Sequence, residues 1–137
     1  MSGSADFFIR ARVAEETVLA ILEKILHRDI ESIEHPNNKA DIFLQHLEYS
    51  EGFALNAGLA WGLDEFELNE PQTARALARE LSTDVLFQSE KLELPASMEW
   101  CLAKPEGNVY AVNIIELDDG IDVHPDTPIR LIPLGSN

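Results

Sequence analysis

The chain has 137 residues, with 25 acidic and 10 basic side chains and a formal net charge of −15 at pH 7. Its length suits one domain built around one core, and a hydrophobic content of 45% argues against disorder. A negative field of this size repels nucleic acid and anionic membranes, so neither is expected as a partner, and it attracts basic proteins.

The first elements are a strand and a helix. Apolar and polar side chains alternate over residues 6–13, which predicts a strand. From Glu15 the apolar side chains recur at helical spacing, so a helix follows. Two continuations remain open: the helix extends until Pro36, or it ends earlier and a short strand forms near Ile30.

A hairpin and a second helix come next. Residues 41–49 and 53–61 are apolar runs separated by a short polar turn, which predicts two antiparallel strands. Pro71 suits the first turn of a helix whose apolar stripe includes Leu77. The second run of the hairpin is expected to place five side chains on one core face: Phe53, Leu55, Ala57, Leu59 and Trp61.

The last part of the chain reads as strands. Residues 84–88 predict a buried strand, and residues 98–102 and 109–117 predict a hairpin around the turn at 105–108. The tail from about residue 124 contains three prolines, so we expect it to be irregular, with an edge strand at 129–132.

This order of elements predicts one α+β domain over residues 1–137, with two helices on one face of a mainly antiparallel sheet. The first six elements read β-α-β-β-α-β. That order is similar to ferredoxin-like split β-α-β folds, and the final hairpin would extend the sheet.

The sequence predicts a cytoplasmic protein. Cys101 is the one cysteine, so no disulfide can form within the chain, which fits a reducing compartment. The first residues lack the basic start and apolar run of a signal peptide, and no apolar stretch is long enough to span a membrane.

The longer form of the first helix would offer a possible metal site. There His27, Glu31, Glu34 and His35 would share one face, but no other segment offers a second pair of ligands. A solvated polar face is the preferred interpretation. Nucleophile, zinc-protease, phosphate-loop and dinucleotide motifs are absent from the sequence, so we predict no enzyme activity, metal or cofactor.

A second acidic group follows the last strong strand. Asp118, Asp119, Asp122, His124 and Asp126 could offer oxygen ligands to a hard cation. Their spacing does not match a calcium-binding EF-hand loop. A turn with exposed carboxylates is therefore the preferred interpretation.

The acidic excess is regional and suggests a basic protein partner. Residues 28–70 hold ten acidic and two basic side chains. Aromatic anchors flanked by carboxylates can engage a basic surface; alternatively, Phe66 and Leu68 cover the edge of the sheet. The candidate partner-binding residues form a first group, Trp61, Asp64, Glu65, Phe66, Glu67 and Glu70, and a second group, Asp118, Asp119 and Asp122.

In length, charge and class, the chain resembles the immunity proteins with which bacteria neutralise toxins of contact-dependent inhibition, type VI or bacteriocin systems. The hairpin from Trp100 to Gly120 is similar to segments of such proteins. The resemblance implies a protein that binds and inhibits a cognate toxin, for which a basic nuclease is the expected type. The alternative function is an adaptor, chaperone or ligand-sensing module without catalysis.

Overall fold

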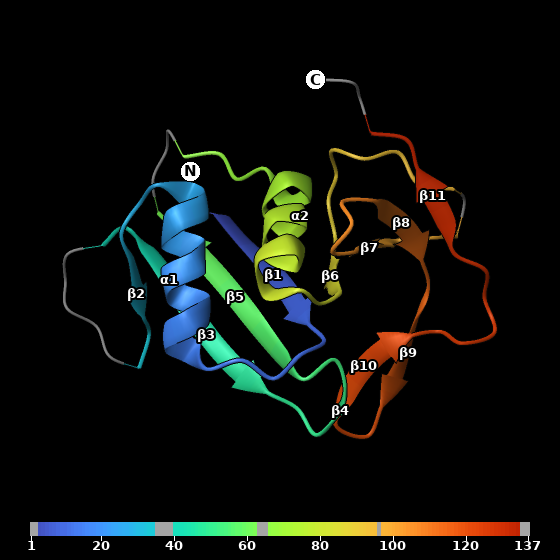
Figure 1. Ribbon diagram of the computed structural model, residues 1–137, viewed down its shortest axis with the longest axis horizontal. Helices are drawn as coiled ribbons and strands as arrows, with labels where there is room; N and C mark the ends of the chain where they lie inside the picture. The colour runs from blue at the N-terminus through green and yellow to red at the C-terminus, as the bar shows by residue number, and fades with distance from the viewer. Residues whose placement is uncertain (1–2, 35–39, 63–65, 96, 135–137) are drawn as a thin grey trace.

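The computed structural model describes residues 3–34, 40–62, 66–95 and 97–134. Two helices cover one face of an eight-stranded sheet, and a three-stranded sheet lies beyond one end of β1 (Figure 1). The α+β class and the mainly antiparallel sheet are as predicted. The elements are β1 Gly3–Ile9, α1 Glu15–Leu26, β2 Ile30–Ser32, β3 Ile42–Glu48, β4 Glu51–Gly52, β5 Leu55–Trp61, α2 Glu70–Leu81, β6 Val85–Phe87, β7 Trp100–Ala103, β8 Val109–Val112, β9 Ile114–Leu117, β10 Gly120–Val123 and β11 Arg130–Ile132.

The strand order of the large sheet is β11-β8-β7-β6-β1-β5-β3-β2, and that of the small sheet is β4-β10-β9. Neighbours in the large sheet are antiparallel except β2 and β3, which are parallel. The predicted hairpins appear as β3 with β5 and β7 with β8, and the edge strand near residue 130 pairs with β8.

The first helix is the shorter of the two alternatives. It ends at Leu26, and His27 takes the left-handed conformation with φ 55°, which cannot continue a helix. The chain then enters β2, so the expected strand near Ile30 is confirmed and the helix extension to Pro36 is wrong. The extension fails because Ile30 packs in the core as part of a parallel pair with β3.

Capping explains where α2 begins and ends. Asn69 accepts a hydrogen bond from the N–H of Gln72 at 3.1 Å, and Pro71 occupies the first turn. Ser82 ends the helix in the left-handed conformation. The helix is thus held at the position that its proline and apolar stripe predicted.

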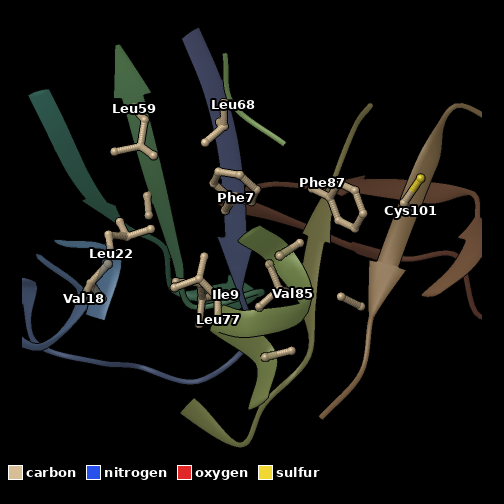
Figure 2. Packing of buried hydrophobic residues seen from close by; sticks show 14 of the residues in the cluster. Phe7, Ile9, Val18, Leu22, Leu59, Leu68, Leu77, Val85, Phe87 and Cys101 are labelled. Atoms are coloured by element: carbon tan, nitrogen blue, oxygen red, sulfur yellow. The ribbon is translucent and has the colours of Figure 1, made fainter. Parts of the chain in front are cut away.

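The main core lies between the helices and the sheet (Figure 2). Phe7 and Ile9 of β1 are fully buried against side chains of both helices and of neighbouring strands. Each helix carries a wide apolar stripe, and the two stripes pack against the face of the sheet that the helices cover. Labelled members of this cluster are Phe7, Ile9, Val18, Leu22, Leu59, Leu68, Leu77, Val85, Phe87 and Cys101.

Phe53 does not share the core face of β5, contrary to the prediction. It is buried in a second cluster with Leu86, Leu102 and Val112, on the side of the sheet away from the helices. The preceding Gly52 has φ +67°, and a Cβ there would lie 2.1 Å from the carbonyl oxygen of Ile121. This irregular backbone breaks the alternation of side chains between the two faces of the sheet, and the alternation resumes only at β5.

Two strand boundaries also differ from prediction. The expected strand 109–117 is divided at Asn113, whose carbonyl accepts the N–H of His124 at 2.8 Å, and β9 then belongs to the small sheet. The first strand covers Gly3–Ile9 instead of residues 6–13. Its pairing partner β5 extends to Trp61, which lies opposite Gly3, so the strand begins earlier than the alternation suggested.

Candidate functional site: an acidic hollow beside β1

A notch interrupts the large sheet between β1 and β7. β5 pairs with β1 along all of Gly3–Ile9, whereas β6 pairs with it only from Phe7 to Ile9. β6 ends at Phe87, so the first half of β1 lacks a neighbour on that side among the described strands. The notch lies at the end of β1 that is remote from the small sheet (Figure 1).

Two adjoining cavities lie at the notch, with volumes of about 860 Å³ and about 270 Å³. They share Ser4, Glu70 and Gln88, so we treat them as one site and name it the acidic hollow. Its lining residues are Ser4, Ala5, Asp6, Phe8, Glu67, Glu70, Gln88, Ser89, Glu90, Lys91, Glu99 and Trp100.

Carboxylates dominate the acidic hollow, and one lysine neutralises part of their charge. The Nζ of Lys91 lies 3.1 Å from a carboxylate oxygen of Glu70 and 3.9 Å from one of Glu67. The same ammonium donates to the carbonyl of Leu68 at 2.9 Å, which fixes it at the start of α2. The ammonium group of Lys91 therefore pairs with two of the lining acids.

The other lining acids, Asp6, Glu90 and Glu99, make no ion pair or hydrogen bond through their side chains with any residue that the structure describes. All are exposed to solvent. Their charges come from β1 and from both ends of the connection between β6 and β7. This gathering leaves a net negative hollow in which three carboxylates have no partner within the described part of the chain.

Aromatic rings form the deeper wall of the acidic hollow. The rings of Phe8 and Trp100 meet edge to face with centroids 5.9 Å apart, and Phe8 also stacks on Tyr49 at 6.3 Å. Both lining rings are half-buried. A ring face next to carboxylates is a favourable setting for a guanidinium or ammonium group.

Trp61 and Phe66 lie against the protein core, outside the lining of the acidic hollow. Their rings meet edge to face at 5.1 Å, and the guanidinium of Arg28 lies 5.2 Å from the Phe66 ring. A Cβ on Gly3 would lie only 2.6 Å from the Trp61 indole, so the indole covers the start of β1. Leu68 is almost fully buried, which supports the covering role for this segment.

Of the first predicted group, Glu67 and Glu70 line the acidic hollow, whereas Trp61 and Phe66 pack against the main core and are not part of its lining. Asp64 and Glu65 fall outside the described residues. The side chain of Glu67 is 84% exposed and that of Glu70 is 22% exposed. Glu67 therefore stands at the rim, and Glu70 sits deeper, beside Lys91.

The second predicted group belongs to the small sheet, away from the acidic hollow. Asp122 pairs with Arg10 at 3.1 Å. Asp119 accepts from the N–H and hydroxyl of Ser50 at 2.8 Å and 2.6 Å, and these hydrogen bonds lower the pKa of its carboxyl. Asp118 is exposed. Asp119 thus holds the small sheet against the turn between β3 and β4, and Asp122 holds it against the end of β1.

The predicted helical ligand face is not formed. His27 is exposed at the end of α1, Glu31 is buried in β2, Glu34 is exposed beyond it, and His35 falls outside the described residues. Within the described ranges, His, Cys, Asp and Glu side chains form no group of three or more that could hold a metal ion.

Cys101 is fully buried, and desolvation raises the pKa of its thiol to about 11. The thiol therefore stays protonated at neutral pH, which makes it a poor nucleophile. Its side chain faces the core beside Phe87 (Figure 2).

Sequence reasoning missed most of the acidic hollow. Asp6, Glu90, Glu99 and Trp100 come from segments that meet only because β1 and β7 lie on either side of the short β6. The acids between residues 90 and 99 gave a weak signal, since they cluster in a connection between strands.

No protein family, curated protein or solved structure matches the chain. Among the helices of the described chain, none is long and apolar enough to cross a membrane.

Proposed function

We propose that this chain is an acidic binding protein that inhibits a basic protein, as bacterial immunity proteins inhibit the toxin nucleases of interbacterial competition. Such a nuclease needs a basic site to hold phosphates, so an inhibitor that presents carboxylates gains rapid encounter and charge-assisted hydrogen bonds. The proposal assigns no catalysis, metal or cofactor to the chain, and it places the protein in the cytoplasm.

The observation that carries the proposal is the acidic hollow itself. Its acids come from distant segments, yet Asp6, Glu90 and Glu99 have no partner among the described residues. Unengaged carboxylates that repel one another cost stability unless a ligand uses them. A basic partner would neutralise them and would also find an aromatic wall at Phe8 and Trp100.

The alternative function, an adaptor, chaperone or ligand-sensing module, is favoured by a different feature. A groove of about 490 Å³ runs between α1 and α2, with Leu26, Phe66 and Ala76 among its lining residues. Lys24 and Glu80 bridge it at 2.9 Å. A partly apolar groove of this size suits a small ligand.

We also relate the central strands to the ferredoxin-like arrangement. The order β6-β1-β5-β3, with antiparallel neighbours, supports this relation. Along the chain α1 lies between β1 and β3, with β2 inserted after it, and α2 lies between β5 and β6; each of these two strand pairs is separated by one other strand in the sheet. β2 and the strands beyond β6 are additions to that arrangement.

The test of the proposed function is affinity capture from the native cytoplasm on the immobilised chain, at low and at high salt. We expect a basic protein that elutes as salt rises, because the attraction is screened. The recovered protein should lose its activity when mixed with this chain. Capture that does not respond to salt, or a partner whose activity is unchanged, would overturn the proposal.

A further inference from the structure

In addition to its charges, the acidic hollow contains a strand edge that no other described strand covers. β6 stops opposite Phe7, so Gly3–Asp6 face the notch with their β6 side. No backbone hydrogen bond joins these four residues to a described residue on that side. Unpaired N–H and C=O groups of a strand edge are ready to pair with another extended chain.

The hydrogen-bonding groups that face the notch can be identified. Arg10 donates its N–H to the carbonyl of Asp84, on the β6 side of the strand. Because N–H groups alternate in direction along a strand, Asp6 and Ser4 also point theirs toward that side. Ala5 and Phe7 direct theirs toward β5. Two N–H donors that are unpaired among the described residues therefore line the edge at the spacing that one short strand requires.

The side chains next to this edge are acidic and aromatic. Asp6 and Phe8 project from the face of β1 opposite to Phe7 and Ile9, which is the face without helices. Trp100 reaches the same hollow from β7, and Glu99 precedes it. An added strand would therefore place alternate side chains between carboxylates and an aromatic ring.

We propose that an extended basic segment of the protein partner binds in the acidic hollow as a short strand on the free edge of β1. Its arginine or lysine side chains lie against Trp100 and pair with Asp6 and Glu99. This mode of recognition rests on the proposed function, since it specifies how a basic partner is bound.

Charge and backbone pairing together favour this occupant over others. Main-chain hydrogen bonds to an edge give affinity without sequence preference, and the flanking side chains then select the residues of the added strand. Here those side chains are acidic and aromatic, which selects cations. A second copy of this chain is disfavoured, because its net charge of −15 would bring like charges together.

The probe is a blocked hexapeptide of alternating arginine and threonine, which places three guanidinium groups on one face of a strand. Binding is followed by the fluorescence of Trp100 in a Trp61→Phe background, where it is the remaining tryptophan. We expect saturable quenching that weakens with salt. The same peptide with citrulline in place of arginine should bind at least about tenfold more weakly.

Neutral substitutions test the assigned acids. The double variant Asp6→Asn, Glu99→Gln should weaken peptide binding roughly five- to tenfold, since each exposed pair contributes modestly. The matched control, Glu34→Gln with Asp126→Asn, removes the same charge from exposed acids outside the acidic hollow and should change binding less than about twofold. Equal effects in the two variants would overturn the assignment of the site.

Amide hydrogen exchange on the unmodified chain tests the strand pairing directly. Peptide binding should slow exchange at Ser4 and Asp6, whereas Ala5 and Phe7 already bond to β5 and should change little. Binding that leaves Ser4 and Asp6 unchanged means that side-chain attraction alone holds the peptide, and strand addition is then wrong. Protection that rises with protein concentration in the absence of peptide would identify self-association and would also overturn the inference.

The recovered partner separates this inference from the proposed function. If the partner is inhibited equally by the chain and by its Asp6→Asn, Glu99→Gln variant, and leaves Ser4 and Asp6 exchange unchanged, the inference fails while the function stands. If the peptide binds as expected but no captured protein is inhibited, the inhibitor function fails while the binding mode stands.

Discussion

The guanidinium of Arg10 lies over the ring of Phe53, 4.2 Å from its centroid. The same group pairs with Asp122 of the small sheet at 3.1 Å and with Asp84, just before β6, at 3.5 Å. Phe53 belongs to the second apolar cluster, which Ile121 and Val123 of β10 also contact. Arg10 therefore joins the small sheet to the end of β1.

Substitution Arg10→Ala should lower the free energy of unfolding by about 1–2 kcal/mol, as the sum of one cation–π contact and two partly exposed ion pairs. Urea unfolding followed by circular dichroism measures this. Arg130→Ala is the matched control, because Arg130 is exposed on β11 and makes no ion pair with a described residue. Equal midpoints for the two variants would show that the Arg10 contacts contribute nothing measurable.

The buried thiol of Cys101 predicts how stability changes in alkaline solution. Its pKa is raised from 9.0 to about 11, so the unfolded chain loses this proton at lower pH than the folded chain. The contribution to stability is complete below pH 9 and is lost as pH rises toward 11. We expect the urea midpoint to fall over this window, and to fall less steeply in Cys101→Ala.

A labelling experiment gives an independent check on Cys101. A thiol-specific reagent at pH 7 should react slowly with the folded chain and rapidly in denaturant, because burial both blocks access and disfavours the thiolate. Rapid labelling of the native chain would show that Cys101 is accessible, contrary to its position in the core.

The hydrogen bonds that Asp119 accepts from Ser50 can be tested by titration. Hydrogen bonds from Ser50 lower the pKa of its carboxyl, so the favourable interaction is present at neutral pH and is lost as pH falls through the folded pKa. Ser50→Ala should raise this pKa, since the hydroxyl donor is removed. Ser50→Thr keeps the hydroxyl and should leave it near its native value. Carboxyl chemical shifts recorded against pH distinguish the variants.

The sequence predicted those parts of the fold that depend on local patterns. Asn69, Pro71 and the apolar stripe of α2 are adjacent in sequence, and so are the strands of each hairpin. The short strand β2 was ambiguous because Ile30 fits a helical stripe as well as a strand, and only pairing with β3 decides between them. The side on which Phe53 packs likewise depends on the close contact between Gly52 and Ile121.

The candidate site was harder to predict than the fold, because its elements meet through sheet order. Glu67 and Glu70 were found from local charge, while Asp6 and Glu99 are 93 positions apart in the chain. Their proximity follows from β6 being too short to separate β1 from β7 along its full length. Charge density alone also selected Asp119 and Asp122, whose partners Ser50 and Arg10 could not be foreseen.

Association kinetics with the captured basic partner test whether the two acidic regions have different roles. Glu67 stands at the rim of the acidic hollow and Asp118 is exposed on the small sheet, so Glu67→Lys and Asp118→Lys make the same change of charge at different sites. The whole-protein field changes equally in both variants, which slows encounter in each. In Glu67→Lys alone, the lost attraction at the acidic hollow should slow association further.

We therefore expect Glu67→Lys to lower the association rate constant several-fold more than Asp118→Lys at low salt, with little change in the dissociation rate constant, since a rim charge acts mainly on encounter. The difference should shrink as salt rises above about 0.15 M, where the screening length falls below about 8 Å. Stopped-flow or surface-binding measurements over a salt series provide both constants. A larger effect of Asp118→Lys would move the partner surface to the small sheet, and a dominant effect on dissociation would place Glu67 inside the interface instead of at its rim.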